Sequence, residues 1–275
     1  MTRIAILDDW QGIAETSTDW QALRAKATLS FLHTAFPTQE ALIAALADFD
    51  AVLVMRERSA FPAAVIARLP KLRAISSPGG RNAAIDLAAC TAHGVQVFNT
   101  PATGSGNATA ELALGLLLAC ARHIAQGDAE IRAGRFQAQV PPGLDLAGRT
   151  LGIIGLGRIG ATMAKYGQAL GMKVQAWSQN LTAARCAELG VAQVDKPTLM
   201  ATSDAISIHM VLSPRSRGTV AEADIARMKP GAILINTSRG PLGDMKPLLA
   251  ALHAGRITAG LDVYENEPML DPRYY

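Results

Sequence analysis

Three glycines with the spacing G-x-G-x-x-G, Gly155, Gly157 and Gly160, are the first residues whose pattern indicates a chemistry. The apolar run 151–154 before them predicts a strand, and the stretch 159–170 after them predicts a helix. In that context the spacing is typical of a turn that binds the pyrophosphate of a dinucleotide, whereas the spacing alone is weak evidence. We expect Gly155 to allow the tight turn, Gly157 to admit the pyrophosphate, and Gly160 to let helix and strand approach closely.

The start of the predicted helix would supply the donors for that anion. The backbone N–H groups of Arg158 and Ile159 belong to the first helical turn, where they have no intrahelical acceptor and the helix dipole favours negative charge. The alternative is a turn between strand and helix that binds nothing.

The residues after the next predicted strand, 173–177, bear on the choice of cofactor. A site selective for NAD carries Asp or Glu about twenty residues past the glycines, where the carboxylate binds the ribose hydroxyls. This chain has Ser178 and Asn180 there, and both can hydrogen-bond a 2′-phosphate. Arg185 is the nearest arginine, so the sequence leaves NAD and NADP both open.

Short apolar runs alternate with helical periodicity along most of the chain, which is the pattern of an α/β fold. In the first hundred residues, strands are predicted at 4–7, 51–55, 72–76 and 95–98, and helices at 38–47, 62–69 and 85–93. Thr38 is the expected N-cap of its helix. A long apolar helix over 107–125, expected to be covered on most sides, follows, and the loop 134–148 precedes the second α/β series.

Composition argues against several classes of protein. The 275 residues are 49% hydrophobic and 18% charged, which is enough apolar material for a sizeable core. The net charge of +3 comes without a cluster of basic residues, so no nucleic-acid partner is expected. The longest apolar run, 112–121, is about half of a membrane span, and the acidic start argues against a signal peptide. Three scattered cysteines without ligand spacing favour a cytoplasmic protein without a metal site.

The chain also carries a series of motifs at 80–87, 99–101, 109–111, 155–160, 228–231, 235–240 and 261–268. In these motifs and their order the whole chain resembles the D-isomer-specific 2-hydroxyacid dehydrogenase family, which includes glyoxylate/hydroxypyruvate reductases and D-3-phosphoglycerate dehydrogenase. The resemblance implies two doubly wound parallel-sheet domains. A flavodoxin-like substrate domain would span 1–100, and a Rossmann dinucleotide-binding domain would span 101–275 and open with the long helix, placed between the domains. It also implies NAD or NADP as cofactor and a homodimer.

The activity that the resemblance implies is hydride transfer between NAD(P)H and a small 2-keto acid. Arg239 matches the family's catalytic arginine, whose rigid fork of donors can hold carboxylate and ketone oxygens together. Glu267 matches the glutamate that pairs with the catalytic histidine and raises its pKa. The alternatives are a capping or surface arginine and a solvent-exposed glutamate.

The family's general-acid histidine stands in a Pro-His motif, about twenty-five residues past that glutamate. This sequence reaches only Tyr275, and none of its five histidines is a convincing substitute. We therefore expect the natural protein to continue further. A chain that ended at Tyr275 would also lack the last strand and the terminal helix that relatives fold back onto the first domain.

Three more residues match cofactor positions of the family. Asp262 resembles the aspartate that accepts a hydrogen bond from the nicotinamide carboxamide, and an acid that caps a loop is the alternative. His209 ends a predicted strand, where it either faces the cofactor or is an ordinary packed residue. Thr237, in the Asn-Thr-Ser-Arg-Gly motif, is assigned to the cofactor as well.

The first domain contributes the residues expected to bind substrate, which are Arg58, Gly79 and Gly80. The glycines would present bare N–H groups to a carboxylate, as an anion-binding nest does. Arg58 is equally compatible with an ordinary surface side chain.

Two other functions share this fold or motif. A non-catalytic dinucleotide-binding protein, with a regulatory or partner-binding role, is favoured by the missing histidine and disfavoured by Arg239 and Glu267. A methyltransferase with the same glycine-rich turn is disfavoured by the placement of the Asn-Thr-Ser-Arg-Gly motif.

Overall fold

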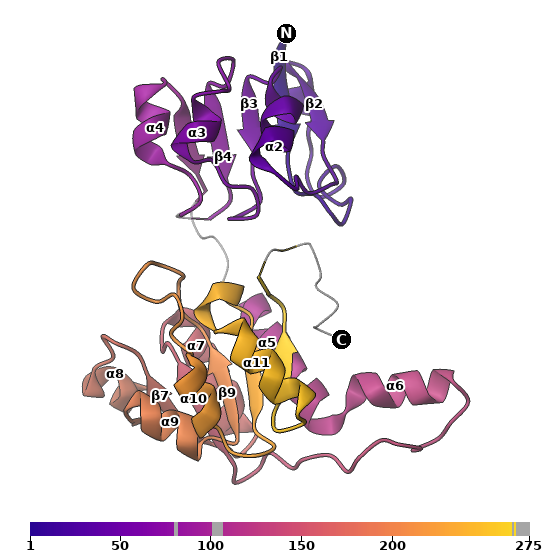
Figure 1. Cartoon of the computed structure of the whole chain (residues 1–275), viewed down its shortest axis with the longest axis vertical. Helices are drawn as coiled ribbons and strands as arrows, with labels where there is room; N and C mark the ends of the chain where they lie inside the picture. Colours follow the sequence, from indigo (N-terminus) through magenta and orange to yellow (C-terminus); the bar gives the residue numbers. More distant parts are fainter. Residues whose placement is uncertain (80–81, 101–106, 266, 268–275) are drawn as a thin grey trace. The chain divides into compact units, whose positions relative to one another are not determined.

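The computed structural model describes residues 1–79, 82–100, 107–265 and 267 (Figure 1). The chain divides into two compact units, Met1–Thr103 and Gly104–Tyr275. The division expected from the sequence, at residue 100, lies close to this boundary.

The first unit is built on a five-stranded parallel sheet in the order β2-β1-β3-β4-β5. Its strands are β1 (Thr2–Ile6), β2 (Ala27–Phe31), β3 (Ala51–Leu53), β4 (Ala74–Ser77) and β5 (Gln96–Asn99). Its helices are α1 (Gln21–Arg24), α2 (Gln39–Leu46), α3 (Ala63–Ile66) and α4 (Leu87–Ala92). This strand order is that of flavodoxin-like folds, so the predicted class of the first domain is confirmed.

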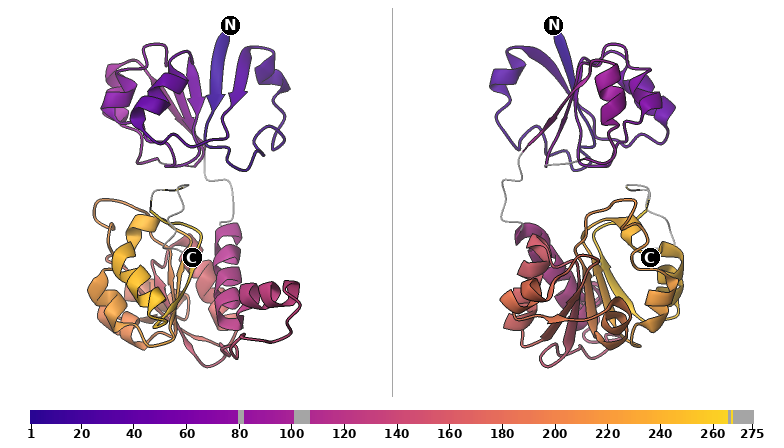
Figure 2. Two further views of the ribbon diagram at one scale, coloured as in Figure 1. Left: turned by 45° about the vertical axis from the view of Figure 1, so that its right-hand side comes forward. Right: turned by 90° about the vertical axis from the view of Figure 1, so that its left-hand side faces the viewer.

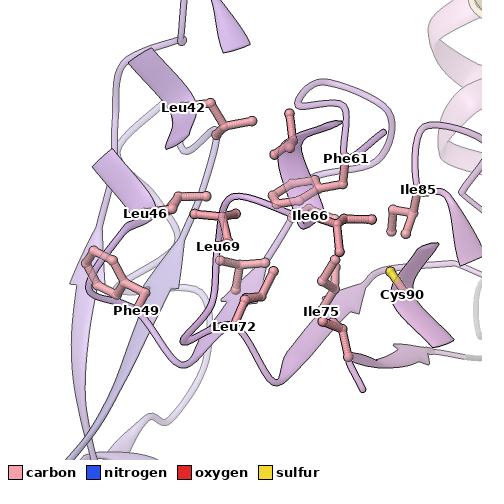
Figure 3. Close-up of a cluster of buried hydrophobic side chains, with 14 of the residues drawn as sticks. Leu42, Leu46, Phe49, Phe61, Ile66, Leu69, Leu72, Ile75, Ile85 and Cys90 are labelled. Atoms are coloured by element: carbon pink, nitrogen blue, oxygen red, sulfur yellow. The ribbon is translucent and has the colours of Figure 1, made fainter. Parts of the chain in front are cut away.

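The core of the first unit fills the space between the sheet and the helices α2, α3 and α4, as Figure 3 shows. Phe61, Ile66 and Ile75 are almost fully buried there. Thr38 caps α2 as predicted, since its hydroxyl accepts from the Ala41 amide. The helix predicted at 62–69 is shorter than expected, however, because only α3 is α-helical within that range.

The second unit carries a six-stranded parallel sheet in the order β11-β10-β9-β6-β7-β8. Its strands are β6 (Thr150–Ile154), β7 (Lys173–Trp177), β8 (Ala192–Gln193), β9 (Ala205–Ile208), β10 (Ile233–Asn236) and β11 (Thr258–Leu261). Its helices are α5 (Asn107–Arg122), α6 (Ile124–Arg132), α7 (Arg158–Ala169), α8 (Ala183–Glu188), α9 (Lys196–Thr202), α10 (Glu222–Arg227), the 3-10 turn η1 (Gly240–Leu242) and α11 (Met245–His253). One apolar cluster joins the sheet to α5 and α7, and another joins it to α9, α10 and α11. Helices therefore cover both faces, which confirms a doubly wound Rossmann domain.

The long helix predicted over 107–125 is broken. His123 has φ 53° and ψ 39°, and the chain turns there from α5 into α6, which projects away from the sheet (Figure 2). A residue in the left-handed region cannot continue a right-handed helix, so α5 ends at Arg122.

The second unit covers one face of this helix. Ala110, Ala113, Leu117 and Ala121 are buried on the face that packs against α7, β10 and β11. Within the described part of this unit Leu112 is 42% exposed, so the expectation that the helix lies between the domains and is covered on most sides stays a prediction.

In the described residues, no single helix has the length and apolar character of a membrane span. The pair α5 and α6 reaches that length and composition together, but the two helices are bent by 63°. Within the same residues no three His, Cys, Asp or Glu side chains are grouped as metal ligands.

Candidate functional site

The carboxyl edge of the second sheet collects most of the predicted site. Because its strands are all parallel, the residues that follow β11, β10, β9, β6 and β7 emerge at the same edge. These residues are Asp262, Arg239, His209, Gly155 and Ser178, in that order along the edge. The strand order reverses at β6, and such a reversal opens a crevice for a ligand in doubly wound sheets.

Backbone hydrogen bonds hold neighbouring strand ends of this edge in register. The Gly155 amide donates to the Trp177 carbonyl at 2.9 Å, and the His209 amide donates to the Ile154 carbonyl at 2.8 Å. On the other side, the Asp262 amide donates to the Asn236 carbonyl at 3.1 Å. The backbone at Gly155, His209 and Asp262 is thus held by the sheet itself.

The glycine turn has the geometry that its sequence predicts. Gly155 has φ 98°, and a Cβ there would lie 2.9 Å from the carbonyl carbon of His209. A Cβ on Gly160 would collide with the carbonyl oxygen of Gly155. A Cβ on Gly157 would meet no atom within 4 Å, so space is open where a pyrophosphate would approach.

The first residues of α7 have the predicted orientation for an anion. Gly157 occupies the N-cap position, and no side chain there caps the helix. Arg158 and Ile159 are the first two helical residues, so their amides lack intrahelical acceptors.

A cleft of about 520 Å³ opens beside the glycine turn. Its lining residues include Gly155, Gly157, Ser178, Asn180, Arg185 and Arg215. The cleft, the open space at Gly157 and the uncapped N-terminus of α7 fit a dinucleotide. Gly160 contributes to the packing of the fold, because the absence of a side chain lets α7 pack closely against β6 beside this cleft.

His209 and Thr237 hold buried polar atoms without partners. The Nδ1 atom of His209 and the Oγ1 atom of Thr237 have no hydrogen bond within the described part of the chain. The other ring nitrogen of His209 bonds to the Ser207 hydroxyl at 2.8 Å. Burial lowers the pKa of His209 to about 4, so the imidazole is neutral near pH 7. An unpaired buried atom is costly, and a bound group at this edge would relieve the cost.

Arg239 lies on the loop between β10 and η1, half-buried. Its carbonyl accepts from the Asn236 amide group at 3.0 Å, and its Nη1 donates to the Ser238 carbonyl at 2.6 Å. The Ser238 hydroxyl in turn donates to the Ile208 carbonyl at 2.8 Å, which ties the loop to the end of β9. The Arg239 side chain forms no capping hydrogen bond with η1.

The glycine after Arg239 brings two loops together. A Cβ on Gly240 would lie 2.9 Å from the Glu265 amide and nearer still to the Tyr264 carbonyl. Only glycine allows this approach, which places the Arg239 loop against the segment that leads to Glu267. The sequence contained this signal, since the glycine completes the Asn-Thr-Ser-Arg-Gly motif.

The two acidic residues after β11 that the sequence assigned to the site, Asp262 and Glu267, have different surroundings. The carboxylate of Glu267 is half-buried and accepts from the Tyr264 amide at 3.0 Å, so it is not simply a solvent-exposed glutamate. Asp262 is exposed at the end of its strand.

In the first unit, Arg58 is exposed but fixed. Its guanidinium lies 4.0 Å from the centroid of the Trp10 ring, and Nη1 donates to the Asp8 carbonyl at 2.9 Å. Ser59 donates to the Asp8 carboxylate at 2.9 Å. Burial raises the pKa of Asp8, and Ser59 and Arg58 offset part of that rise. Arg58 is therefore an ordered cation and not a freely moving surface side chain.

The expected anion nest of the first unit is not found at Gly79. Gly79 has φ 91°, as a tight turn requires, but its amide donates to the Thr100 hydroxyl at 2.9 Å. The expectation of a bare amide is therefore wrong at this position, because a nearby hydroxyl already satisfies the donor. Gly80 lies outside the described residues.

Comparison with known proteins decides to which family this arrangement belongs. The family model for the NAD binding domain of D-isomer specific 2-hydroxyacid dehydrogenases matches residues 114–273. The chain belongs to the D-isomer specific 2-hydroxyacid dehydrogenase family. Its second unit is accordingly an NAD(P)-binding domain, as the sequence predicted.

Individual relatives agree with this assignment. A D-3-phosphoglycerate dehydrogenase of Mycobacterium leprae is 38% identical over 236 residues, which are 86% of this chain and 44% of that protein. A hydroxypyruvate reductase of Thermotoga maritima is 39% identical over 221 residues, 80% of this chain and 71% of that protein. The crystal structure of a phosphoglycerate oxidoreductase from Vibrio cholerae superposes with a TM-score of 0.92 at 35% identity and covers 99% of this chain and 87% of that one. The chain thus spans less than half the length of the first of these dehydrogenases.

Proposed function

We propose that the protein transfers hydride between NAD(P)H and a small 2-keto acid, such as glyoxylate or hydroxypyruvate, to give a D-2-hydroxy acid. The observation that carries this proposal is Arg239, held at the carboxyl edge of an NAD(P)-binding sheet by hydrogen bonds to the ends of β9 and β10.

The residues of this chain would each meet one need of the reaction. Gly157 and the start of α7 hold the pyrophosphate of the cofactor, which when bound supplies the hydride. Arg239 binds the keto acid and stabilises the negative charge that grows on the ketone oxygen. Glu267 would fix the general-acid histidine that the family places about twenty-five residues past this glutamate, and Asp262 would bind the nicotinamide carboxamide.

Substrate selection would fall partly to the first unit. Arg58 carries a positive charge that Trp10 and Asp8 hold in one orientation, which suits a carboxylate or another anionic group of the substrate.

We also propose that the protein works as a homodimer.

The experiment is a steady-state assay of the purified natural protein at its full length, with NADH or NADPH and a panel of keto acids. We expect oxidation of the cofactor with glyoxylate or hydroxypyruvate and a D-configured chiral product. Arg239→Lys should lower kcat/KM by about 100-fold, because one cation cannot replace the bidentate fork. Arg227→Lys, on the exposed face of α10, is the matched control and should leave it unchanged. Cofactor binding without turnover of any keto acid would instead indicate a non-catalytic dinucleotide-binding protein.

A further inference from the structure

The end of β7 forms one corner of the dinucleotide cleft. Ser178, Gln179, Asn180 and Thr182 line this corner, and the residues known to line the cleft include no Asp or Glu. The hydroxyl of Ser178 has no hydrogen-bond partner within the described part of the chain. A corner without carboxylates lacks the group that binds both ribose hydroxyls of NAD and repels a phosphate in their place.

A second loop brings a cation to the same corner. Arg215 lies between β9 and α10 and lines the cleft together with Ser213 and Ser216. When the Asn180 amide is turned so that its oxygen faces Arg215, Nη2 of Arg215 donates to that oxygen at 2.9 Å and the Asn180 nitrogen donates to the Gln179 carbonyl, which is the orientation that satisfies both groups. The side chain of Gln179 donates back to the Arg215 carbonyl at 3.3 Å. Two segments that are far apart in sequence are thus joined where the ribose of a bound dinucleotide would lie.

The turn that carries Arg215 is well ordered. The buried Ser216 hydroxyl donates to the Val211 carbonyl at 2.6 Å and accepts from the Ser213 amide at 2.8 Å. These bonds fix the backbone on both sides of Arg215, so little backbone conformational entropy is lost when a ligand binds there.

In the described residues no carboxylate neutralises the charge of Arg215. Arg185, the other arginine of the cleft, forms an ion pair with Glu188 at 2.7 Å. For Arg215 no carboxylate partner is found among the described residues. The corner therefore carries a net positive charge and several neutral donors, which together match a phosphate monoester.

We propose that this corner, formed by Ser178, Asn180 and Arg215, binds the 2′-phosphate of NADP(H), and that the protein prefers NADP(H) to NAD(H). The proposal rests on the proposed function, because it assigns the phosphate-bearing member of the cofactor pair to the same cleft. Arg215 is the specificity-determining residue, and Ser178 and Asn180 complete the hydrogen bonds of the phosphate.

The test is calorimetric titration of the whole protein with two fragments, adenosine 2′,5′-bisphosphate and adenosine 5′-monophosphate. We expect the bisphosphate to bind more tightly by about 10- to 100-fold, as hydrogen bonds to a charged group would give. Arg215→Ala should remove most of this preference while the monophosphate binds as before. Arg217→Ala, which removes the same charge two residues away at an exposed position, should keep the preference.

A second variant adds a negative charge to the corner formed by Ser178, Asn180 and Arg215. Ser178→Asp should bind the monophosphate at least as well as the unchanged protein and should bind the bisphosphate worse, because the carboxylate repels the phosphate. Equal affinity for both fragments, or a preference that survives Arg215→Ala, would overturn the specificity proposal and leave the proposed function intact. Failure of both fragments to bind would overturn the dinucleotide site, and with it the proposed function.

Discussion

At the scale of single residues, two glycines of the nucleotide turn have opposite surroundings. A Cβ on Gly157 would enter open space, whereas a Cβ on Gly160 would meet the Gly155 carbonyl and lie 3.2 Å from a methyl group of Ile153. Gly157→Ala should therefore leave the stability of the free protein nearly unchanged and weaken NADPH binding by about tenfold or more, because the methyl group occupies the approach of the pyrophosphate. Gly160→Ala should cost about 1–3 kcal/mol of stability, since the helix must move away from the strand.

Thermal unfolding and fluorescence titration with NADPH separate these two effects. Gly127→Ala in α6 is the control, because no atom lies within 4 Å of the added carbon. It should bind NADPH normally. Normal binding by Gly157→Ala would show that the pyrophosphate lies elsewhere.

His209 gives a prediction for pH. Its folded-state pKa is about 4, below the 6.5 of an ordinary histidine. Between these values the unfolded chain binds the extra proton and the folded one does not, so the free energy of unfolding should rise with pH from about 4 to 6.5 and level off above. The slope from one such group is at most ~1.4 kcal/mol per pH unit. His209→Gln should remove this contribution, as urea unfolding at several pH values would measure.

The assignment can be checked independently by NMR of the protein with labelled histidines. The imidazole signal that disappears in His209→Gln should titrate near pH 4 in the unchanged protein. A signal that titrates near 6.5 would mean that the ring is more exposed to water than the structure has it. Asp8, whose pKa is raised, has a pH effect of opposite sign, so only the difference between the two proteins is informative.

At the scale of elements, the turn at His123 stores backbone strain. A non-glycine residue in the left-handed region costs about 1–2 kcal/mol, and the cost is greatest for β-branched side chains. His123→Gly should relieve part of this strain and raise the melting temperature by about 1–3 °C, whereas His123→Val should lower it. Differential scanning calorimetry of the two variants measures both shifts, and equal shifts would exclude strain at this turn as their cause.

The same elements show what sequence could predict. The strand at 173–177 is observed with those limits as β7, because Val174, Ala176 and Trp177 follow a glycine turn at the distance expected of the second strand in a nucleotide-binding unit. The break at His123 left no such signal, since neither proline nor glycine stands there and helical periodicity continues across it. α1 and β2 were not predicted. The four residues of α1 are too few for a helical period to be detected, whereas β2 did carry a signal, because its apolar residues alternate with Thr28 and Ser30 as in a half-buried strand.

In the candidate site, too, local sequence patterns could be predicted and contacts between distant segments could not. Gly155, Gly157 and Gly160 could be recognised because all their partners are close in sequence. Arg215 could not, because its place beside Asn180 depends on the strand order β9-β6-β7, which brings two distant loops to one edge of the sheet.

At the scale of the whole molecule, the second unit exposes several large apolar side chains to solvent, which is energetically unfavourable for an isolated chain. Ile124, Ile131 and Phe136, on α6 and just after it, are 55%, 57% and 77% exposed. Three large apolar side chains on one projecting segment are typical of an association surface, and burying each of them would contribute about 1.5–3 kcal/mol. This segment therefore supports the proposed homodimer.

Substitution of this segment tests the homodimer directly. Ile131→Glu together with Phe136→Glu places two charges where a partner would bury apolar side chains, so the double variant should be a monomer by light scattering coupled to gel filtration. The unchanged protein should have twice the mass of one chain. Val211→Glu, at another exposed apolar residue, should leave the mass unchanged and is the control. A double variant that is still dimeric would move the association surface to another part of the molecule, while a monomeric unchanged protein would contradict the homodimer itself.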